Sequence, residues 1–186
     1  MDQTSWAGKL LVATPVLTDP NFTRTVILLL DHGDDGAIGL VLNRPSSLRL
    51  AEAMPGWEDV AASPPVLFAG GPVEPDAVIA LGRARPEVFP TPEWSPIVDR
   101  LRVVDLSAGA EVADAQVEAA RVFVGYAGWA PGQLEAEVAA DAWFVTDARD
   151  LDALADEPDV LWSEVLRRQR GDVALFATFP DDPSLN

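Results

Sequence analysis

Two arginines are the first residues whose types and spacing indicate chemistry. Arg24 and Arg44 lie equally far in sequence from Asp34, the centre of a predicted hairpin turn, so we expect them opposite each other at its open end. Like charges on facing strands repel. Guanidinium groups pair readily with carboxylate or phosphate, so we predict an acidic side chain or a bound anion between them. Asp19 and Asp31 are the candidates within the chain, and an internal partner of this kind would leave no ligand site.

A second constellation lies near residue 130. Gly125-Tyr126-Ala127-Gly128 precedes Trp129, and a predicted helix starts at Pro131. Glycines permit a tight path into a helix N-terminus, where free N–H groups attract anions. The alternative is a strand-to-helix turn wedged by the tryptophan ring. The two constellations together give the candidate ligand-binding residues Asn21, Arg24, Asn43, Arg44, Trp129 and Gln133.

Several classes of catalytic site are excluded by residue type. The chain has no cysteine, which rules out disulfides, thiolate metal sites and cysteine nucleophiles, and His32 is its single histidine. A serine hydrolase would need His32 as its base, yet the G-x-S-x-G motif is absent. The phosphate-binding motifs G-x-x-x-x-G-K-[ST] and G-x-G-x-x-G are absent as well. We interpret His32 as a turn or hydrogen-bonding residue and predict no catalytic residue, no metal site and no cofactor.

Charge limits the partners. The chain carries 13 basic and 30 acidic side chains, a net charge of −17. Such a charge repels phosphate backbones and anionic membranes, so direct nucleic-acid binding is disfavoured. No apolar run approaches the ~20 residues of a membrane span, and residues 1–9 lack the basic start of a signal peptide. We expect a cytoplasmic protein without membrane association.

Apolar periodicity and turn residues predict the elements that must position these side chains. We expect strands over residues 8–14, 25–30, 37–42, 66–68, 77–81, 101–106, 122–126 and 142–146, and helices over 50–62 (broken at Pro55-Gly56), 111–119, 131–140 and from Pro158 onward. The strand at 25–30 is apolar enough to be covered on both faces. Residues 31–36 form the predicted turn, residues 83–96 hold four prolines and predict an irregular loop, and residues 147–159 predict a solvated acidic linker.

The predicted fold is a mixed α and β (α+β) single domain spanning residues 1–186. No Pro/Gly/Ser-rich linker separates two cores, and 48% apolar residues suit one globular core. The apolar stripe Leu134, Val138 and Ala142 indicates the buried side of one helix. Leu40, Leu42, Trp143 and Trp162 are predicted to be mostly buried.

Several motifs in the same order resemble the YqgE/AlgH family of bacterial proteins. They are residues 11–15 (LVATP), 19–25, 36–45 (GAIGLVLNRP), 70–73 (GGPV) and 125–135, and the resemblance covers about residues 8–166. It implies a compact fold with a largely antiparallel, barrel-like sheet and packed helices. It implies no particular reaction, although one branch, AlgH, carries a transcriptional-regulator label. The ending Phe179-Pro180-Asp181-Asp182-Pro183 is more similar to actinobacterial members than to that branch.

Three function classes follow from these observations. The first is a non-enzymatic binding or regulatory module that acts through a partner protein or a small ligand. The second is an enzyme or sensor for a small anionic metabolite at the Arg24/Arg44 end, and the weakest is a DNA-binding regulator. A ligand-shaped pocket beside the two arginines would favour a ligand, whereas a flat apolar patch would favour a partner protein.

Overall fold

The computed structural model describes residues 5–88 and 96–180. These residues form one nine-stranded sheet in the order β4-β5-β8-β3-β2-β1-β9, with β6 joining β8 to β7. The strands are β1 (Lys9–Ala13), β2 (Val26–Gly33), β3 (Gly36–Val41), β4 (Pro45–Arg49), β5 (Val66–Ala69), β6 (Val73–Ala84), β7 (Leu101–Val104), β8 (Val117–Trp129) and β9 (Trp143–Asp147). Most pairs are antiparallel, and β5 with β8 is parallel. The mixed α and β prediction is confirmed. The sheet is open, with β4 and β9 at its two ends, so the expected barrel does not close.

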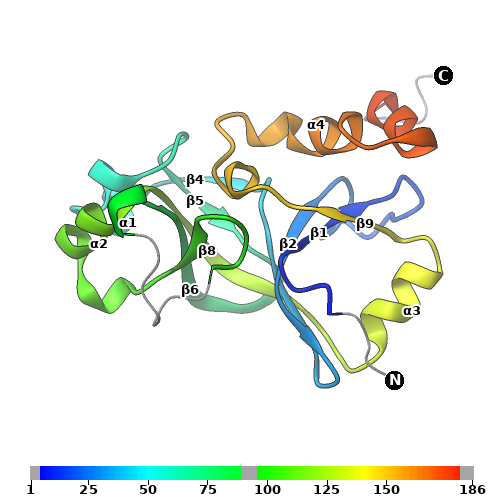
Figure 1. Ribbon diagram of the computed structural model, residues 1–186, viewed down its shortest axis with the longest axis horizontal. Helices are drawn as coiled ribbons and strands as arrows, with labels where there is room; N and C mark the ends of the chain where they lie inside the picture. The colour runs from blue at the N-terminus through cyan, green and yellow to red at the C-terminus, as the bar shows by residue number, and fades with distance from the viewer. Residues whose placement is uncertain (1–4, 89–95, 181–186) are drawn as a thin grey trace.

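The α-helices are short and lie on both sides of the sheet. They are α1 (Leu50–Ala53), α2 (Ala110–Gln116), α3 (Gln133–Ala139) and α4 (Leu161–Arg167). The described 3₁₀ segments are η1 (Glu58–Val60), η2 (Pro86–Val88), η3 (Leu106–Ala108), η4 (Asp150–Leu154), η5 (Pro158–Val160) and η6 (Gly171–Thr178). Figure 1 shows α4 and α3 on opposite sides of β1, β2 and β9, and α1 and α2 at the far end of the molecule. No described helix is long and apolar enough to span a bilayer.

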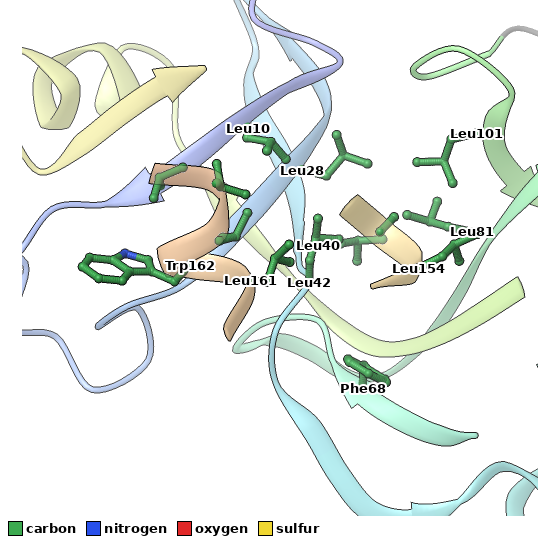
Figure 2. Packing of buried hydrophobic residues seen from close by; sticks show 14 of the residues in the cluster. Leu10, Leu28, Leu40, Leu42, Phe68, Leu81, Leu101, Leu154, Leu161 and Trp162 are labelled. Carbon is green, nitrogen blue, oxygen red and sulfur yellow. The ribbon is translucent and has the colours of Figure 1, made fainter. Parts of the chain in front are cut away.

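The central strands are buried on both faces, as their apolar runs predicted. In β1, Leu10 and Val12 belong to the core under α4, whereas Leu11 and Ala13 belong to the core on the α3 side. Alternate residues of a strand point to opposite faces, so one short run supplies two cores. Figure 2 shows the α4 side, where leucines of β1, β2 and β3 meet the α4 residues Leu161 and Trp162. Leu40, Leu42, Trp143 and Trp162 are all buried, as predicted.

The predicted hairpin is present, and its turn is tighter than expected. Strands β2 and β3 pair with Ile27 opposite Val41, the register that the spacing of the two arginines required. A bulge at Leu30 then shifts the register by one residue, and Asp34-Asp35 alone close the turn. His32 was predicted within the turn and instead lies inside β2. The reason is that Gly33 and Gly36 pair directly, so the strands run further than the polar residues indicated.

Strand β8 is much longer than the predicted strand at 122–126, and the helix predicted at 111–119 ends at Gln116. The extra length lets β8 pair with β3 at one end and with β5 and β6 at the other. Gly71 and Gly125 allow the segment between β5 and β6 to lie directly against the backbone of β8. A Cβ on Gly71 would stand 2.1 Å from the Tyr126 carbonyl carbon, and one on Gly125 would stand 2.4 Å from the Gly71 oxygen.

The acidic stretch at 147–159 is not a solvated linker. It holds η4 and η5, and Asp150 and Asp152 are buried there. Asp152 accepts two 2.6 Å hydrogen bonds from the Arg168 guanidinium. The acidic composition predicted that these residues would stay in water. The ion pair with Arg168 offsets the cost of burying the Asp152 carboxylate.

Other predicted boundaries shift in the same way. Strand β6 extends to Ala84 and η2 follows it, so the start of the predicted loop at 83–96 has regular structure. Residues 89–95 of that loop lie outside the described residues. Residues 181–183 of the motif at the end of the chain lie outside them too. The predicted helix at 50–62 is reduced to α1 and η1. Strand β4, with every residue exposed, had no apolar signal and was not predicted.

Candidate functional site

The candidate site is built on the loop of residues 14–25, which joins β1 to β2. The loop is closed by its own hydrogen bonds, and the main-chain oxygen of Asp19 accepts from the N–H groups of Phe22 and Thr23. The Asp19 carboxylate accepts from the Asn21 N–H at 2.8 Å. Asp and Asn favour such local closures, which is why this polar segment holds one conformation. Asp19 is therefore occupied within the loop.

Asn43 and Arg44 fasten this loop to the end of β3. The Asn43 side chain is buried; its Oδ1 accepts from the Val26 N–H at 2.9 Å and its Nδ2 donates to the Arg24 carbonyl at 2.9 Å. Arg44 Nη2 donates to the Thr23 carbonyl at 2.6 Å. The Asn-Arg-Pro motif thus completes the hairpin pairing with side chains where the backbone ladder stops.

Arg24 lies across Trp162. Its guanidinium carbon is 4.0 Å from the centre of the Trp162 ring, and Nη1 donates to the Phe179 carbonyl at 3.0 Å. The Arg24 backbone adopts φ +55°, a left-handed conformation that is rare for a residue with a side chain. Strain of this kind persists only where surrounding contacts fix it, and here Asn43, Trp162 and Phe179 do so.

Arg24 and Arg44 line one pocket, hereafter the arginine pocket. It has a volume of about 480 Å³ and is lined by Thr18, Pro20, Thr23, Arg24, Asn43, Arg44, Asp159 and Trp162. A smaller apolar hollow of about 240 Å³ shares Arg24 and Trp162 with it and includes Phe179 and Pro180. Sequence reasoning missed Thr18, Thr23 and Asp159, because only the folded loop and η5 bring them to the arginines.

The counter-charge predicted between the arginines stays a prediction. The hydrogen bonds described for the two guanidiniums go to main-chain carbonyls. Asp31 lies at the opposite end of the hairpin, where its carboxylate accepts from the His32 N–H. The acidic side chain that lines the arginine pocket is Asp159, from η5.

Trp129 and Gln133 lie elsewhere, around Glu137 of α3. The indole N–H groups of Trp129 and Trp143 donate to Glu137 Oε2 at 2.9 and 2.8 Å, and Gln133 Nε2 donates to Oε1 at 3.0 Å. Gln133 Oε1 accepts from the Ala130 N–H, which closes the turn before α3. The segment therefore has the alternative structure expected from the sequence, a strand-to-helix turn against which the Trp129 ring packs. It touches the loop through the Phe22 ring, whose centre is 6.3 Å from that of Trp129.

His32 is buried in a structural contact on the α3 side. Its Nδ1 accepts from the Trp6 N–H at 3.1 Å, so the proton of the neutral ring is on Nε2, which lies 3.2 Å from Glu135 Oε1. The Trp6 ring stacks on the imidazole with 4.8 Å between centres. Both ring nitrogens are occupied, which confirms the hydrogen-bonding interpretation of His32.

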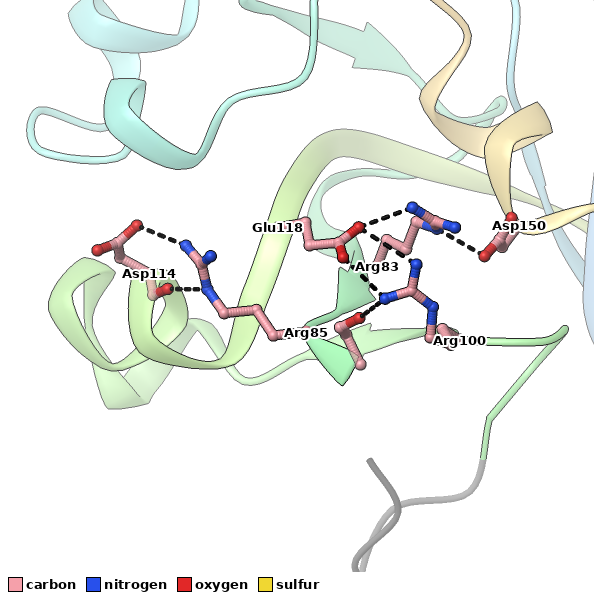
Figure 3. Close-up of polar contacts among 7 residues, drawn as sticks. Arg83, Arg85, Arg100, Asp114, Glu118 and Asp150 are labelled. Atoms are coloured by element: carbon pink, nitrogen blue, oxygen red, sulfur yellow. Dashed lines mark hydrogen bonds and ion pairs between the residues drawn. The ribbon is translucent and has the colours of Figure 1, made fainter. Parts of the chain in front are cut away.

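A separate ion-pair network links β6, β8, η4 and Arg100, the residue before β7 (Figure 3). Glu118 accepts from Arg100 Nη1 at 2.8 Å and from Arg83 Nη1 at 2.7 Å, and Arg83 Nε donates to Asp150 at 2.7 Å. The hydrogen bond from Arg100 contributes most to holding the pKa of Glu118 below its usual range. These residues pair with one another, so the network stabilises the sheet.

Arg121 of β8 and Arg102 of β7 are both buried in this half, Arg121 the more deeply. The Arg121 guanidinium donates to the carbonyls of Ser63, Ala153 and Ala155, and it lies 4.2 Å from the centre of the Phe68 ring. Burial lowers the pKa of Arg121 to about 10. It fixes η4 against β8. No group of three or more metal-ligating side chains occurs within residues 5–88 and 96–180.

Comparison with known proteins gives one consistent result. Residues 10–174 match the family described as AlgH-like. A UPF0301 protein of Streptomyces coelicolor is 48% identical, covering 98% of this chain and 96% of the relative. A crystal structure of a Corynebacterium diphtheriae protein aligns with TM-score 0.87 and 31% identity over 96% of this chain and 94% of that one. The solution structure of Pseudomonas aeruginosa AlgH aligns with TM-score 0.69 and 29% identity over 98% of this chain and all of that one. The chain belongs to the AlgH-like family.

Proposed function

We propose that this protein is a non-enzymatic binding module whose arginine pocket takes a small anionic ligand bearing a carboxylate or a phosphate. The observation that carries the proposal is that Arg24 and Arg44 line one pocket. The two guanidiniums outnumber Asp159, the one carboxylate that lines the cavity, so the pocket is a local positive site in a chain of net charge −17. The hydroxyl groups of Thr18 and Thr23 line the same cavity and can donate further hydrogen bonds to an anion.

Preorganisation supports the same proposal. Arg44 is held by Thr23, and that hydrogen bond uses one of the five N–H donors of a guanidinium. Arg24 is held over Trp162. Side chains fixed before binding lose little conformational entropy when a ligand arrives. The loop of residues 14–25 therefore has the properties of a preformed site.

A reaction at this pocket has less support than binding. His32 lies at the other end of the hairpin with both ring nitrogens occupied, so it supplies no general base to the arginine pocket. A sensor of a small anionic metabolite would use the same pocket by binding alone. For a DNA-binding regulator, the net charge of −17 remains the opposing argument.

A partner protein is the second candidate. Val16 is 69% exposed beside the apolar hollow, and Phe179, which lines that hollow, is 41% exposed. Apolar side chains at the rim of a pocket are typical of contact surfaces. If the ligand is a partner protein, one of its acidic side chains would occupy the arginine pocket. The sequence leads us to expect that this binding takes place in the cytoplasm.

The experiment is calorimetric titration and thermal shift with inorganic phosphate and with citrate. The wild type should bind at least one anion, Arg44→Lys should weaken binding several-fold, and Arg44→Met should abolish it. Arg49→Met is the matched control, because Arg49 is an exposed arginine at the end of β4 outside the pocket. Equal loss in both methionine variants, or wild-type protein that binds neither anion, would overturn the proposal.

A further inference from the structure

A second pocket lies at the opposite end of the hairpin, away from the arginines. It has a volume of about 390 Å³ and is lined by Asp31, Asp35, Gly36, Ala37, Ile38, Val73, Tyr126, Gly128 and Trp129. We name it the hairpin-end pocket. Its lining takes in part of the Gly-Tyr-Ala-Gly-Trp motif, which the arginine pocket leaves unexplained.

The pocket is assembled by strand register. Asp31 of β2 pairs with Ile38 of β3, and Ile38 in turn pairs with Gly128 of β8. Residues paired across neighbouring strands point to the same face of a sheet. The bulge at Leu30 is what sets Asp31 opposite Ile38, because an unshifted register would set Leu30 there. A carboxylate, an apolar side chain and a glycine thus form one row across three strands.

Gly128 leaves the floor of the pocket open. A Cβ at this position would stand 3.6 Å from Tyr126 Cε2 and 3.7 Å from Val73 Cγ2, which is ordinary contact distance. The Tyr126 ring and Val73 therefore border the space over Gly128, and Ile38 beside it is 41% exposed. The floor is apolar and partly aromatic.

The charged groups of this pocket have one sign. Asp31 and Asp35 line it, its lining contains no lysine or arginine, and Glu74 interacts with the Tyr126 hydroxyl. Burial, with a smaller contribution from the Glu74 carboxylate, raises the pKa of Tyr126, so the ring is neutral at physiological pH. Two carboxylates beside a neutral aromatic ring attract a cation.

We propose that the hairpin-end pocket binds a short alkylammonium group. The ammonium donates hydrogen bonds to Asp31 and Asp35, since a protonated amine carries three donors and no acceptor. Its methylene groups lie over Gly128 against Ile38 and Val73, where they lose contact with water. The Tyr126 ring, which borders the space over Gly128, adds apolar contact with these methylene groups. This site is independent of the arginine pocket, so either one can fail without the other.

The test follows ¹H–¹⁵N spectra during titration with n-butylammonium chloride, with n-butanol as the uncharged control. The amides of Ile38 and Gly128 should shift with the amine and move little with the alcohol. The double variant Asp31→Asn and Asp35→Asn should weaken binding roughly five-fold or more, since each of the two exposed charge pairs contributes modestly. Gly128→Ala should weaken it by filling the floor at ordinary contact distance, without folding cost.

Asp34→Asn is the matched control, because Asp34 belongs to the same turn and lies outside the lining. It should leave the affinity within two-fold of wild type, by the same reasoning on exposed charges. Weakening in Asp34→Asn as large as in the double variant of Asp31 and Asp35 would show diffuse attraction to the net charge and overturn the proposal. Unchanged affinity in Gly128→Ala, or shifts away from β3 and β8, would overturn it as well.

Discussion

The indole nitrogen of Trp162 donates a hydrogen bond to the carbonyl oxygen of Ala13 over 2.8 Å, although 149 residues separate the two. Both residues are buried. The bond ties α4 to the end of β1, where the loop that carries the candidate site begins. The Arg24 guanidinium lies over the same ring.

Trp162→Phe should therefore cost about 1–3 kcal/mol of unfolding free energy, the usual effect of leaving a buried carbonyl unpaired. Urea denaturation followed by circular dichroism measures it. Trp57→Phe is the control, because Trp57 is also buried and no indole hydrogen bond is described for it. An equal loss in both variants would mean that ring size, not the bond to Ala13, sets the cost.

Leu40→Ala should destabilise the protein by about 2–5 kcal/mol, because Leu40 is completely buried among leucines of β1, β2 and α4. The cavity it leaves cannot collapse between a sheet and a packed helix. The denaturation midpoint measures the loss. Leu48→Ala, at a leucine that is 44% exposed on β4, should change stability by less than about 0.5 kcal/mol.

Gly71→Ala should cost more than about 3 kcal/mol, because its new methyl group would meet the backbone of Tyr126, which cannot move aside. Gly132→Ala separates contact from conformation. Gly132 also has a positive φ of +75°, yet a Cβ there meets nothing within 4 Å, so about 1–2 kcal/mol is expected. Comparable losses at both positions would contradict the close approach of Gly71 to the β8 backbone.

Glu118 should make the protein sensitive to acid. Its pKa in the folded chain lies below the ordinary value of 4.5, so its contribution to stability is complete above that pH and disappears as pH falls through the folded value. Wild-type protein should lose stability between about pH 5 and 3 more steeply than Glu118→Gln. Glu52→Gln, at an exposed glutamate of α1, should keep the wild-type slope.

The hairpin was predictable because its signals are local. The apolar runs on either side of a polar, glycine-bearing turn fix the pairing of Ile27 with Val41, and this brings Arg24 and Arg44 to the same end. The bulge at Leu30 has no local signal. Its effect is to place His32 on the buried side, against Trp6, and to leave Asp31 exposed.

The rest of the candidate site depends on contacts between distant segments. Asp159 ends a stretch that reads as a linker, and Trp162 follows it. Arg121 and Arg83, both distant in sequence, hold this stretch against the sheet through the Ala153 and Ala155 carbonyls and the Asp150 carboxylate. Gln133 and Trp129 fit an anion-binding helix start equally well on paper. In the folded chain both donate hydrogen bonds to Glu137, one turn along α3 from Gln133.

The pairing of β1 with β9 has a consequence for synthesis of the chain. Lys9 meets Asp147 across this pair, 138 residues later. Translation delivers the N-terminal hairpin first, so one edge of β1, with four residues destined for complete burial, stays open until β9 has been made. Unpaired apolar edges are where chains associate wrongly. The β1 edge is therefore the part of a nascent chain most exposed to wrong association until β9 emerges.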